Sequence, residues 1–240
     1  MFNYKDLKKE FNDNLVVNHY DALFQKFQIT PSEQYIINKF VHKNSKILEI
    51  GCGTGRICIN LAKDLYKNII AIDIAKNMIK RTRKNMREQN VLFATYTMSA
   101  SRLKVLNMKF DAILFMYNGF CDIPQKSNRE KTLKVIYDCL KKGGLFIFTT
   151  QDRDNNIENY KQFWEEEKEK YLSGKKKELG DLERIKFENV KTYVNVPTKT
   201  EIFELLNKVS FNIIFSDMTQ RISKDMKKEI GNFRYYVCTK

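Results

Sequence analysis

A glycine-rich segment preceded by an acid is the part of the sequence with the clearest chemistry. Residues 49–55 read Glu-Ile-Gly-Cys-Gly-Thr-Gly and lie between a short apolar stretch and a helical pattern. Glycines allow a sharp turn and let a ligand lie against bare main chain. A second apolar stretch, IIAIDIA, contains Asp73, whose carboxylate can accept hydrogen bonds from both hydroxyls of a ribose. This order of features predicts a site for a nucleoside-containing ligand: an acid, the glycines, a helix, a strand and a second acid.

This loop differs from the loop that binds dinucleotides. The dinucleotide pattern is GxGxxG, and its third glycine lies where the helix packs against the strand. Here the pattern is GxGxG, and Arg56 stands where that third glycine is expected. The acid before the first glycine, Glu49, suits a cationic group better than a pyrophosphate.

The flanking pattern predicts the elements that position the loop. Short apolar strands alternate with amphipathic helices, which predicts a parallel sheet with right-handed crossovers. The five strands expected in this part are 46–50, 68–74, 91–98, 110–117 and 145–150. Two further strands, 211–217 and 233–239, are expected to form a hairpin at the sheet edge. The predicted fold class is therefore α/β, a doubly wound and mostly parallel sheet of seven strands.

The chain divides into a core and an insertion. Residues 45–151 and 198–240 are predicted to form the core. Residues 152–197 are strongly charged and are predicted to form an α+β lid between the fifth strand and the last helix, because structureless loops of that length are uncommon. We expect Phe163 and Trp164 to hold this lid against the core.

Composition limits the class of protein. The chain has 240 residues and a formal net charge of +14, and residues 1–150 carry 25 basic and 13 acidic side chains. The densest basic stretch, 76–87, is compatible with an RNA partner, but lysine is abundant throughout. The five cysteines are scattered without a CxxC pair, which predicts neither a zinc site nor a disulfide framework. No apolar run reaches the ~20 residues that span a bilayer, and residues 1–11 lack a signal-peptide pattern, so we expect a cytoplasmic protein without membrane contact.

The sequence resembles the class I S-adenosylmethionine-dependent methyltransferases. ILEIGCGTGR matches the first motif of that family, AIDIAKNMI the second, FDAILFMYNGF the fourth, and LKKGGLFIFTT the fifth strand. The third motif departs from the family pattern. The family usually places an acid beside the adenine amino group, whereas TYTMSASRL offers only Met98, Ser99 and Ala100.

The resemblance implies S-adenosylmethionine as cofactor, no metal, and helices in residues 1–44 that cover the cofactor site. It implies that Glu49 and the loop hold the methionine end, and that Asp73 binds the ribose. The implied cofactor-binding residues are Tyr20, Glu49, Gly51, Cys52, Gly53, Gly55, Asp73, Ile74, Met78, Met98, Ser99, Ala100, Met116 and Tyr117.

The acceptor side is left open by the sequence. His19, Asn118 and Asp152 are candidates for a base or an orienting group. Phe120, Trp164 and Arg221 are candidates for substrate contacts. The function implied is methyl transfer to an oxygen or nitrogen of a small molecule, by a monomer or homodimer. The alternatives are an RNA methyltransferase and a non-catalytic protein that binds S-adenosylmethionine.

Overall fold

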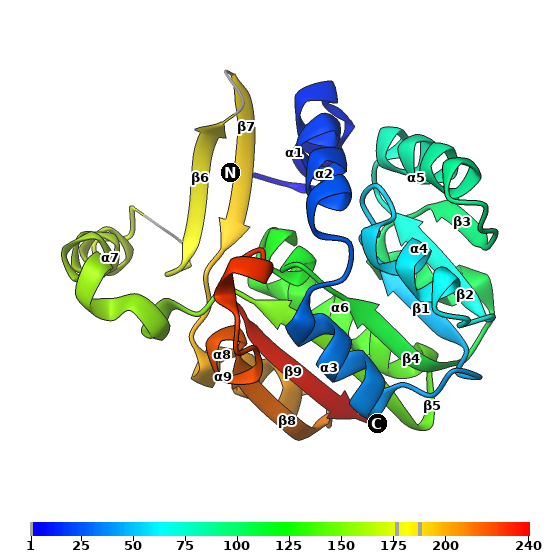
Figure 1. The fold of residues 1–240 in the computed structure, drawn as a ribbon. Helices are drawn as coiled ribbons and strands as arrows, with labels where there is room; N and C mark the ends of the chain where they lie inside the picture. Colours follow the sequence, from blue (N-terminus) through cyan, green and yellow to red (C-terminus); the bar gives the residue numbers. More distant parts are fainter. Residues whose placement is uncertain (1, 176–177, 187–188) are drawn as a thin grey trace.

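A sheet of seven strands forms the centre of the computed structural model, which describes residues 2–175, 178–186 and 189–240 (Figure 1). Its strands are β1 (Ile47–Ile50), β2 (Ile69–Asp73), β3 (Ala94–Thr97), β4 (Phe110–Phe115), β5 (Leu140–Thr150), β8 (Asn212–Met218) and β9 (Arg234–Thr239). The order is β3-β2-β1-β4-β5-β9-β8. β1 to β5 are parallel, while β9 is antiparallel to both β5 and β8. The predicted fold class is confirmed, and so is the terminal hairpin.

Helices cover both faces of this sheet. The main helices of the core are α3 (Pro31–Phe40), α4 (Arg56–Lys63), α5 (Lys76–Glu88), α6 (Lys126–Cys139) and α8 (Lys199–Asn207). Side chains alternate along a strand, so that neighbours point to opposite faces. Leu48 accordingly packs in an apolar core with α6, α8 and the short helix η1 (Ala100–Leu106), whereas Ile47 packs in a second core with α3 and α4. Both faces of the sheet are thus buried, as its continuous apolar strands require.

The strand order places an open crevice beside β1. From β1 the chain moves through β2 to β3 on one side, and then returns to place β4 on the other side of β1. In open α/β sheets, ligands bind outside the carboxyl ends of the strands at such a reversal point. The glycine loop follows β1 directly and therefore lies at this crevice.

The beginning of α3 forms as its sequence predicts. Thr30 is the N-cap, Pro31 occupies the first turn, and the main-chain N–H of Thr30 donates to Glu33 Oε2 at 2.9 Å. Glu33 also pairs with Arg56 at 2.5 Å, with both side chains largely buried. The capping acid therefore also ties α3 to the first turn of α4.

Two strands differ most from their predicted bounds. β3 is shorter than predicted, and β5 begins five residues earlier, at Leu140. The early part of β5 is irregular, because the pairing register with β4 shifts between Phe110 and Ala112. Gly143 has φ +73° there and donates its N–H to Lys240 at 3.2 Å. The Lys-Lys-Gly-Gly segment therefore ends α6 and also opens the strand.

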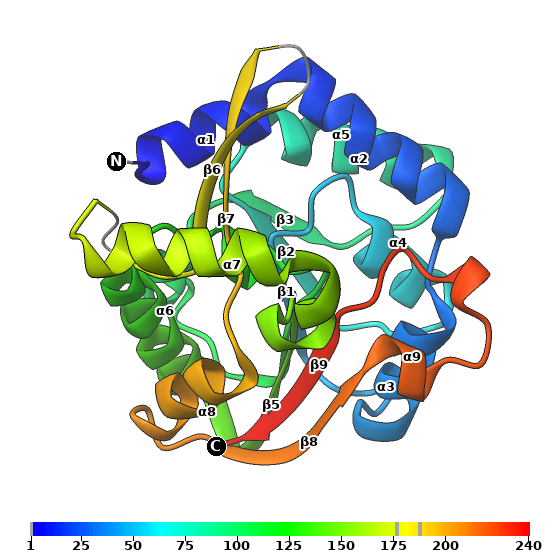
Figure 2. The same ribbon diagram turned by 90° about the vertical axis from the view of Figure 1, so that its left-hand side faces the viewer.

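The segment between β5 and α8 contains a separate ribbon of two antiparallel strands, β6 (Asp181–Lys186) and β7 (Val190–Asn195). Before it come η3 (Arg153–Asn156) and α7 (Ile157–Leu172), and Figure 2 shows α7 on the face turned to the viewer. Residues 176–177 and 187–188 of the predicted lid lie outside the described residues.

The ribbon packs against the N-terminal helices α1 (Tyr4–Asn12) and α2 (Asn14–Phe27), mainly through α1 (Figure 1). Tyr193 of β7 stacks on Phe2 with ring centroids 5.3 Å apart, and its N–H donates to Glu10 Oε2 at 3.3 Å. Phe163 and Trp164, the residues expected to hold the lid against the core, are half-buried on α7. Their rings pack on each other at 4.9 Å, and the guanidinium of Arg153 lies 5.5 Å from the Trp164 ring.

Candidate active site

The glycine loop leaves β1 through three residues with left-handed backbone. Gly51, Gly53 and Gly55 have φ of +64°, +55° and +96°. Side chains make this conformation unfavourable, whereas glycine adopts it readily. The loop is fixed from below by Thr82 of α5, whose Oγ1 donates to the carbonyl oxygen of Gly53 at 2.7 Å. This hydrogen bond holds the main chain of the glycine loop at the N-terminal end of α4.

Gly55→Ala is expected to lower the free energy of unfolding more than Gly143→Ala does. Both glycines have positive φ, so each change should cost about 1–2 kcal/mol in backbone conformation. A Cβ at Gly143 would meet nothing within 4 Å, whereas one at Gly55 would lie 2.8 Å from Ile59 Cδ1 and 3.0 Å from Thr82 Cγ2. Overpacking of this kind should add about 1–3 kcal/mol at Gly55. Urea unfolding of both variants measures the difference, and equal losses would contradict this account.

Glu49 lies buried beneath the loop, with 3% of its surface exposed. Its Oε2 accepts the N–H of Cys58 at 2.9 Å. Burial raises the pKa of this carboxyl to about 7. Arg56, the nearest residue after the loop with a positive charge, forms its ion pair with Glu33. The Glu49 carboxylate would therefore be stabilised by a cationic ligand group beside it.

Asp73, at the end of β2, connects the second strand to the same loop. Its Oδ2 accepts the N–H of Gly53 at 2.9 Å, and its Oδ1 accepts the N–H of Ala75 at 2.8 Å. Burial raises its pKa to about 6. Each oxygen has further capacity to accept a hydrogen bond, since a carboxylate oxygen has two lone pairs.

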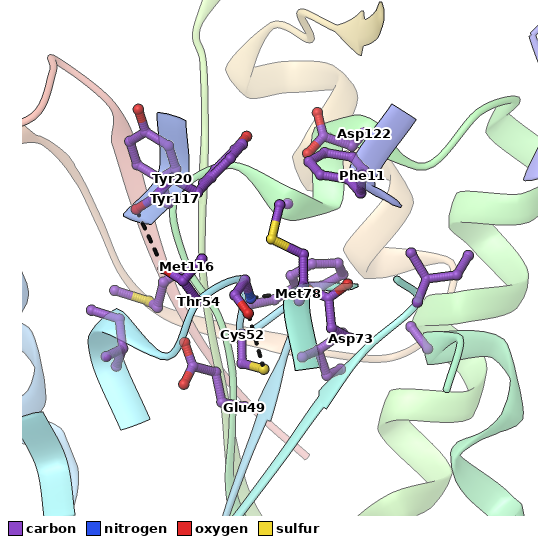
Figure 3. A pocket seen from close by; sticks show the side chains of 18 of the residues that line it. Phe11, Tyr20, Glu49, Cys52, Thr54, Asp73, Met78, Met116, Tyr117 and Asp122 are labelled. Carbon is purple, nitrogen blue, oxygen red and sulfur yellow. Dashed lines mark hydrogen bonds between the residues drawn. The ribbon is translucent and has the colours of Figure 1, made fainter. Parts of the chain in front are cut away.

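One pocket, which we call the main pocket, collects the loop and both acids. Figure 3 shows Glu49, Cys52 and Asp73 on one side and Tyr20 and Tyr117 on the other. Every residue that the sequence assigned to the cofactor lines this pocket, apart from Gly55. Those residues are Tyr20, Glu49, Gly51, Cys52, Gly53, Asp73, Ile74, Met78, Met98, Ser99, Ala100, Met116 and Tyr117.

Several residues of the main pocket were missed by the sequence analysis. Tyr4, Leu7 and Phe11 of α1 line it, and so does Asp122 of the short helix η2 (Gly119–Asp122). The three α1 residues recur at intervals of three and four, which is the spacing of one helix face. That spacing was a usable signal. The position of Asp122 depends on the turn before it and has no comparable local pattern.

Comparisons with known proteins agree with this geometry. A family model described as "Methyltransferase domain" matches residues 47–144, the part that carries both Glu49 and Asp73. A solved S-adenosylmethionine-dependent methyltransferase from Methanosarcina mazei has the same fold, with a TM-score of 0.69 and 20% identity over 85% of this chain and 96% of that chain. Residues 47–144 form a methyltransferase domain of the class I S-adenosylmethionine-dependent type. The cofactor of this methyltransferase is S-adenosylmethionine.

Two curated relatives show how far the similarity extends. An uncharacterised protein of Methanocaldococcus jannaschii is 25% identical over 95% of this chain and 88% of its own length. A carboxy-S-adenosyl-L-methionine synthase of Nautilia profundicola is 31% identical, over 48% of this chain and 47% of its own length. The methyltransferase thus spans about half the length of that second relative.

A second pocket adjoins the main pocket of the methyltransferase. It is bounded by α1 and α2, by the end of β4, and by the β6–β7 ribbon. Phe11, Tyr20, Tyr117 and Asp122 line both pockets, so the two meet at these side chains. Of the predicted acceptor-side residues, the structure brings His19 and Asn118 to this second pocket.

Four other predicted acceptor-side residues are not among those that line either pocket in the described part of the chain. Asp152 is buried and accepts a hydrogen bond from Arg234 Nε at 2.6 Å. Phe120 is 1% exposed and packs in the core against Phe115 and Phe148.

Trp164 and Arg221 also lie outside the two pockets. Trp164 packs with Phe163 on α7, outside the ribbon. The side chain of Arg221 is 71% exposed and lies 3.6 Å from Asp217. The parts of the insertion that line the second pocket are Arg184 of β6 and Thr192, Tyr193 and Val194 of β7.

Among the described residues, no three His, Cys, Asp or Glu side chains lie together in a way that could hold a metal ion. No helix within the described ranges is both long and apolar enough to cross a membrane.

Proposed function

We propose that this chain transfers a methyl group from S-adenosylmethionine to an oxygen or nitrogen of a small molecule. The observation that carries the proposal is the second pocket, which adjoins the main pocket at the side chains of Tyr20 and Tyr117. Binding sites for small molecules are concave and mostly apolar, with a few convergent polar groups. Around the second pocket, five aromatic rings supply apolar wall, and two carboxylates and one buried amide supply convergent polar groups.

The residues of the main pocket fit the cofactor. We assign Asp73 to the ribose hydroxyls, Glu49 and the loop to the methionine end, and Ile74 and Met78 to the adenine. Ser99 stands where the family usually has an acid, and its hydroxyl lies 3.0 Å from that of Ser101. It is our candidate for the adenine amino group, together with the main chain at Ala100.

The cofactor supplies a methyl group on a positively charged sulfur, which is already activated for transfer. The chain then has to align an acceptor, exclude water and, for some acceptors, remove a proton. Tyr20 and Tyr117 lie where the two pockets meet, with ring centroids 5.9 Å apart. We assign them to the alignment of the acceptor with the methyl group.

The direct test of this proposal is the release of S-adenosylhomocysteine. Purified protein with S-adenosylmethionine should release it faster when a mixture of small amines, phenols and carboxylates is added than when RNA is added. Release stimulated only by RNA would contradict the proposal.

Cofactor affinity is expected to fall as the pH is lowered through about 7. In the free protein Glu49 has a pKa of about 7, and a cationic amino group beside it favours the ionised form. Below that pH the carboxylate must lose its proton before it can pair. We therefore expect binding of S-adenosylhomocysteine to weaken about tenfold between pH 8 and pH 6.

Glu49→Gln is the control for this pH dependence. This variant should bind S-adenosylhomocysteine more weakly than the unmodified protein does at pH 8. Its affinity should also vary less between pH 8 and pH 6.5. Calorimetry at several pH values measures both. An affinity that rises as the pH falls would contradict the assignment of Glu49 to the methionine amino group.

The basic face of α5 tests the RNA alternative. Part of this charge is already paired within the protein, since Arg81 lies 2.5 Å from Asp21 and Lys84 lies 3.6 Å from Glu88. We expect RNA binding through Lys80, Arg81, Lys84 and Arg87 to be non-specific, with a Kd of about 1–100 μM at physiological salt. Filter binding to tRNA over a salt series measures this. Submicromolar, sequence-selective binding at physiological salt would favour an RNA methyltransferase.

We also propose a cytoplasmic location and a monomer or homodimer. All five cysteines are free and buried. Free thiols are typical of proteins in reducing compartments.

A further inference from the structure

We infer that the second pocket takes a protonated amine, and that the methyl acceptor is therefore an amine nitrogen. This inference rests on the proposed function and makes it more specific. Three features of the second pocket support it: its carboxylates, its aromatic walls and a buried amide oxygen.

Two carboxylates contribute negative charge to the pocket. Glu10 of α1 is 7% exposed and is held against β7, because its Oε2 accepts the N–H of Tyr193 at 3.3 Å. Asp122 of η2 lines both pockets and so lies at their junction. Burial raises the pKa of the Tyr20 hydroxyl, and the negative charges of Asp122 and Glu10 raise it further. This hydroxyl therefore lies in the field of both acids. A cation is favoured in such a field, and an anionic acceptor is disfavoured.

The basic side chains that line this pocket are exposed, whereas the buried guanidinium groups behind its wall, Arg56 near the Tyr117 ring and Arg129 at the Tyr193 hydroxyl, are each paired with an acid. Arg184 of β6 and His19 of α2 both line the pocket, and both side chains are exposed. Exposed charges are screened by water and salt far more than buried ones. The buried acid Glu10 and the junction acid Asp122 therefore dominate the inner part of the pocket.

Aromatic rings form a continuous wall across the pocket. Tyr20 packs edge-to-face on Tyr117 with centroids 5.9 Å apart, and Tyr117 packs in the same way on Phe233 at 5.6 Å. Phe11 adjoins Tyr20 at 5.8 Å. The faces of aromatic rings attract cations, and they also bury the apolar body of an amine. A hydroxyl or carboxylate acceptor would gain no such attraction.

Asn118 adds an acceptor with no partner of its own. It is 8% exposed and lines the second pocket, and its side-chain oxygen Oδ1 has no hydrogen-bond partner within the described structure. A buried oxygen of this kind is unfavourable unless a donor reaches it. A primary ammonium group has three donors, which suits a pocket lined by one amide and two carboxylates.

The reaction balances with the groups present. The bound ammonium gives one proton to the carboxylate of Asp122, which leaves a neutral amine with a lone pair. The amine nitrogen then forms a bond to the methyl carbon while the carbon–sulfur bond breaks, and the electron pair of that bond stays on sulfur. The products are a methylated ammonium and S-adenosylhomocysteine. No further reactant is needed.

Three probes that share one body test the inference: phenethylamine, 2-phenylethanol and phenylacetate. Their binding is measured by calorimetry on the full chain saturated with S-adenosylhomocysteine. We expect the amine to bind at least tenfold more tightly than the alcohol, and the carboxylate to bind more weakly still. Asp122→Asn and Glu10→Gln should each weaken amine binding at least fivefold and leave alcohol binding within twofold. Asp138→Asn, an exposed acid on α6, should change neither.

The outcomes separate this inference from the proposed function. Binding of S-adenosylhomocysteine is measured first, and its absence would contradict the proposed function. If the cofactor product binds but phenethylamine does not bind, or binds no better than the alcohol or the carboxylate, the amine inference is overturned. The amine inference is also overturned if Asp122→Asn and Glu10→Gln both keep the preference for the amine unchanged.

Discussion

Asp73→Ala is expected to weaken the binding of S-adenosylmethionine and S-adenosylhomocysteine about ten- to a hundredfold. Hydrogen bonds to a charged group contribute about 1.5–3 kcal/mol, and each 1.4 kcal/mol corresponds to about a factor of ten. The carboxylate is 6% exposed and lies in the main pocket, so water replaces its ligand contacts poorly. Calorimetry with S-adenosylhomocysteine measures the change.

Two controls accompany this substitution. Asp64→Ala removes an acid whose side chain is 49% exposed and which pairs with Lys43, and it should leave the affinity unchanged. Asp73→Asn keeps an oxygen that can accept the N–H of Gly53 or of Ala75, which reduces the disturbance of the loop. Urea unfolding shows whether each variant is folded. An affinity for S-adenosylhomocysteine within twofold of the unmodified protein in Asp73→Ala would contradict the assignment of the ribose site.

Replacing residues 152–197 by a short linker is expected to abolish acceptor methylation, with a loss of more than a hundredfold, while cofactor affinity stays within about tenfold. The main pocket is lined by residues outside this segment, whereas Thr192, Tyr193 and Val194 of β7 line the second pocket. Without the ribbon, acceptor positioning and water exclusion are both lost. Release of S-adenosylhomocysteine with an active acceptor and calorimetry measure the two quantities on one protein.

A smaller deletion controls for the disturbance of α1. The ribbon covers Phe2, so its removal exposes apolar surface on the N-terminal helices. Replacing α7 alone leaves β6 and β7 in place, and no described residue of α7 lines either pocket. This variant should keep both cofactor binding and methyl transfer. Full methyl transfer by the protein without 152–197 would contradict the assignment of the β6–β7 ribbon to the acceptor site.

The cofactor side of the site could be predicted from the sequence because its determinants are local. Glu49 and Asp73 lie at the carboxyl ends of β1 and β2, and the glycines follow β1 directly. Parallel strands bring their carboxyl ends to one edge of the sheet. The capping box at Thr30 and Glu33 was equally readable, since it depends on residues three apart. Patterns of this kind need no knowledge of the rest of the fold.

The acceptor side depends on contacts between residues far apart in the chain. Glu10 reaches Tyr193 across 183 positions, and neither residue stands in a recognisable motif. Phe120 was assigned to the substrate, but the turn before it has positive φ at Tyr117 and Asn118, and this directs Phe120 into the core. Trp164 lies on α7, and the sequence did not predict where this helix packs.

The central claim is that the main pocket binds S-adenosylmethionine through the glycine loop, Glu49 and Asp73. Calorimetric titration of the unmodified protein with S-adenosylhomocysteine and, separately, with NADH tests it most directly. We predict a roughly micromolar Kd for S-adenosylhomocysteine, about −8 kcal/mol, and no measurable binding of NADH. Tight binding of NADH together with no binding of S-adenosylhomocysteine or S-adenosylmethionine would contradict the account.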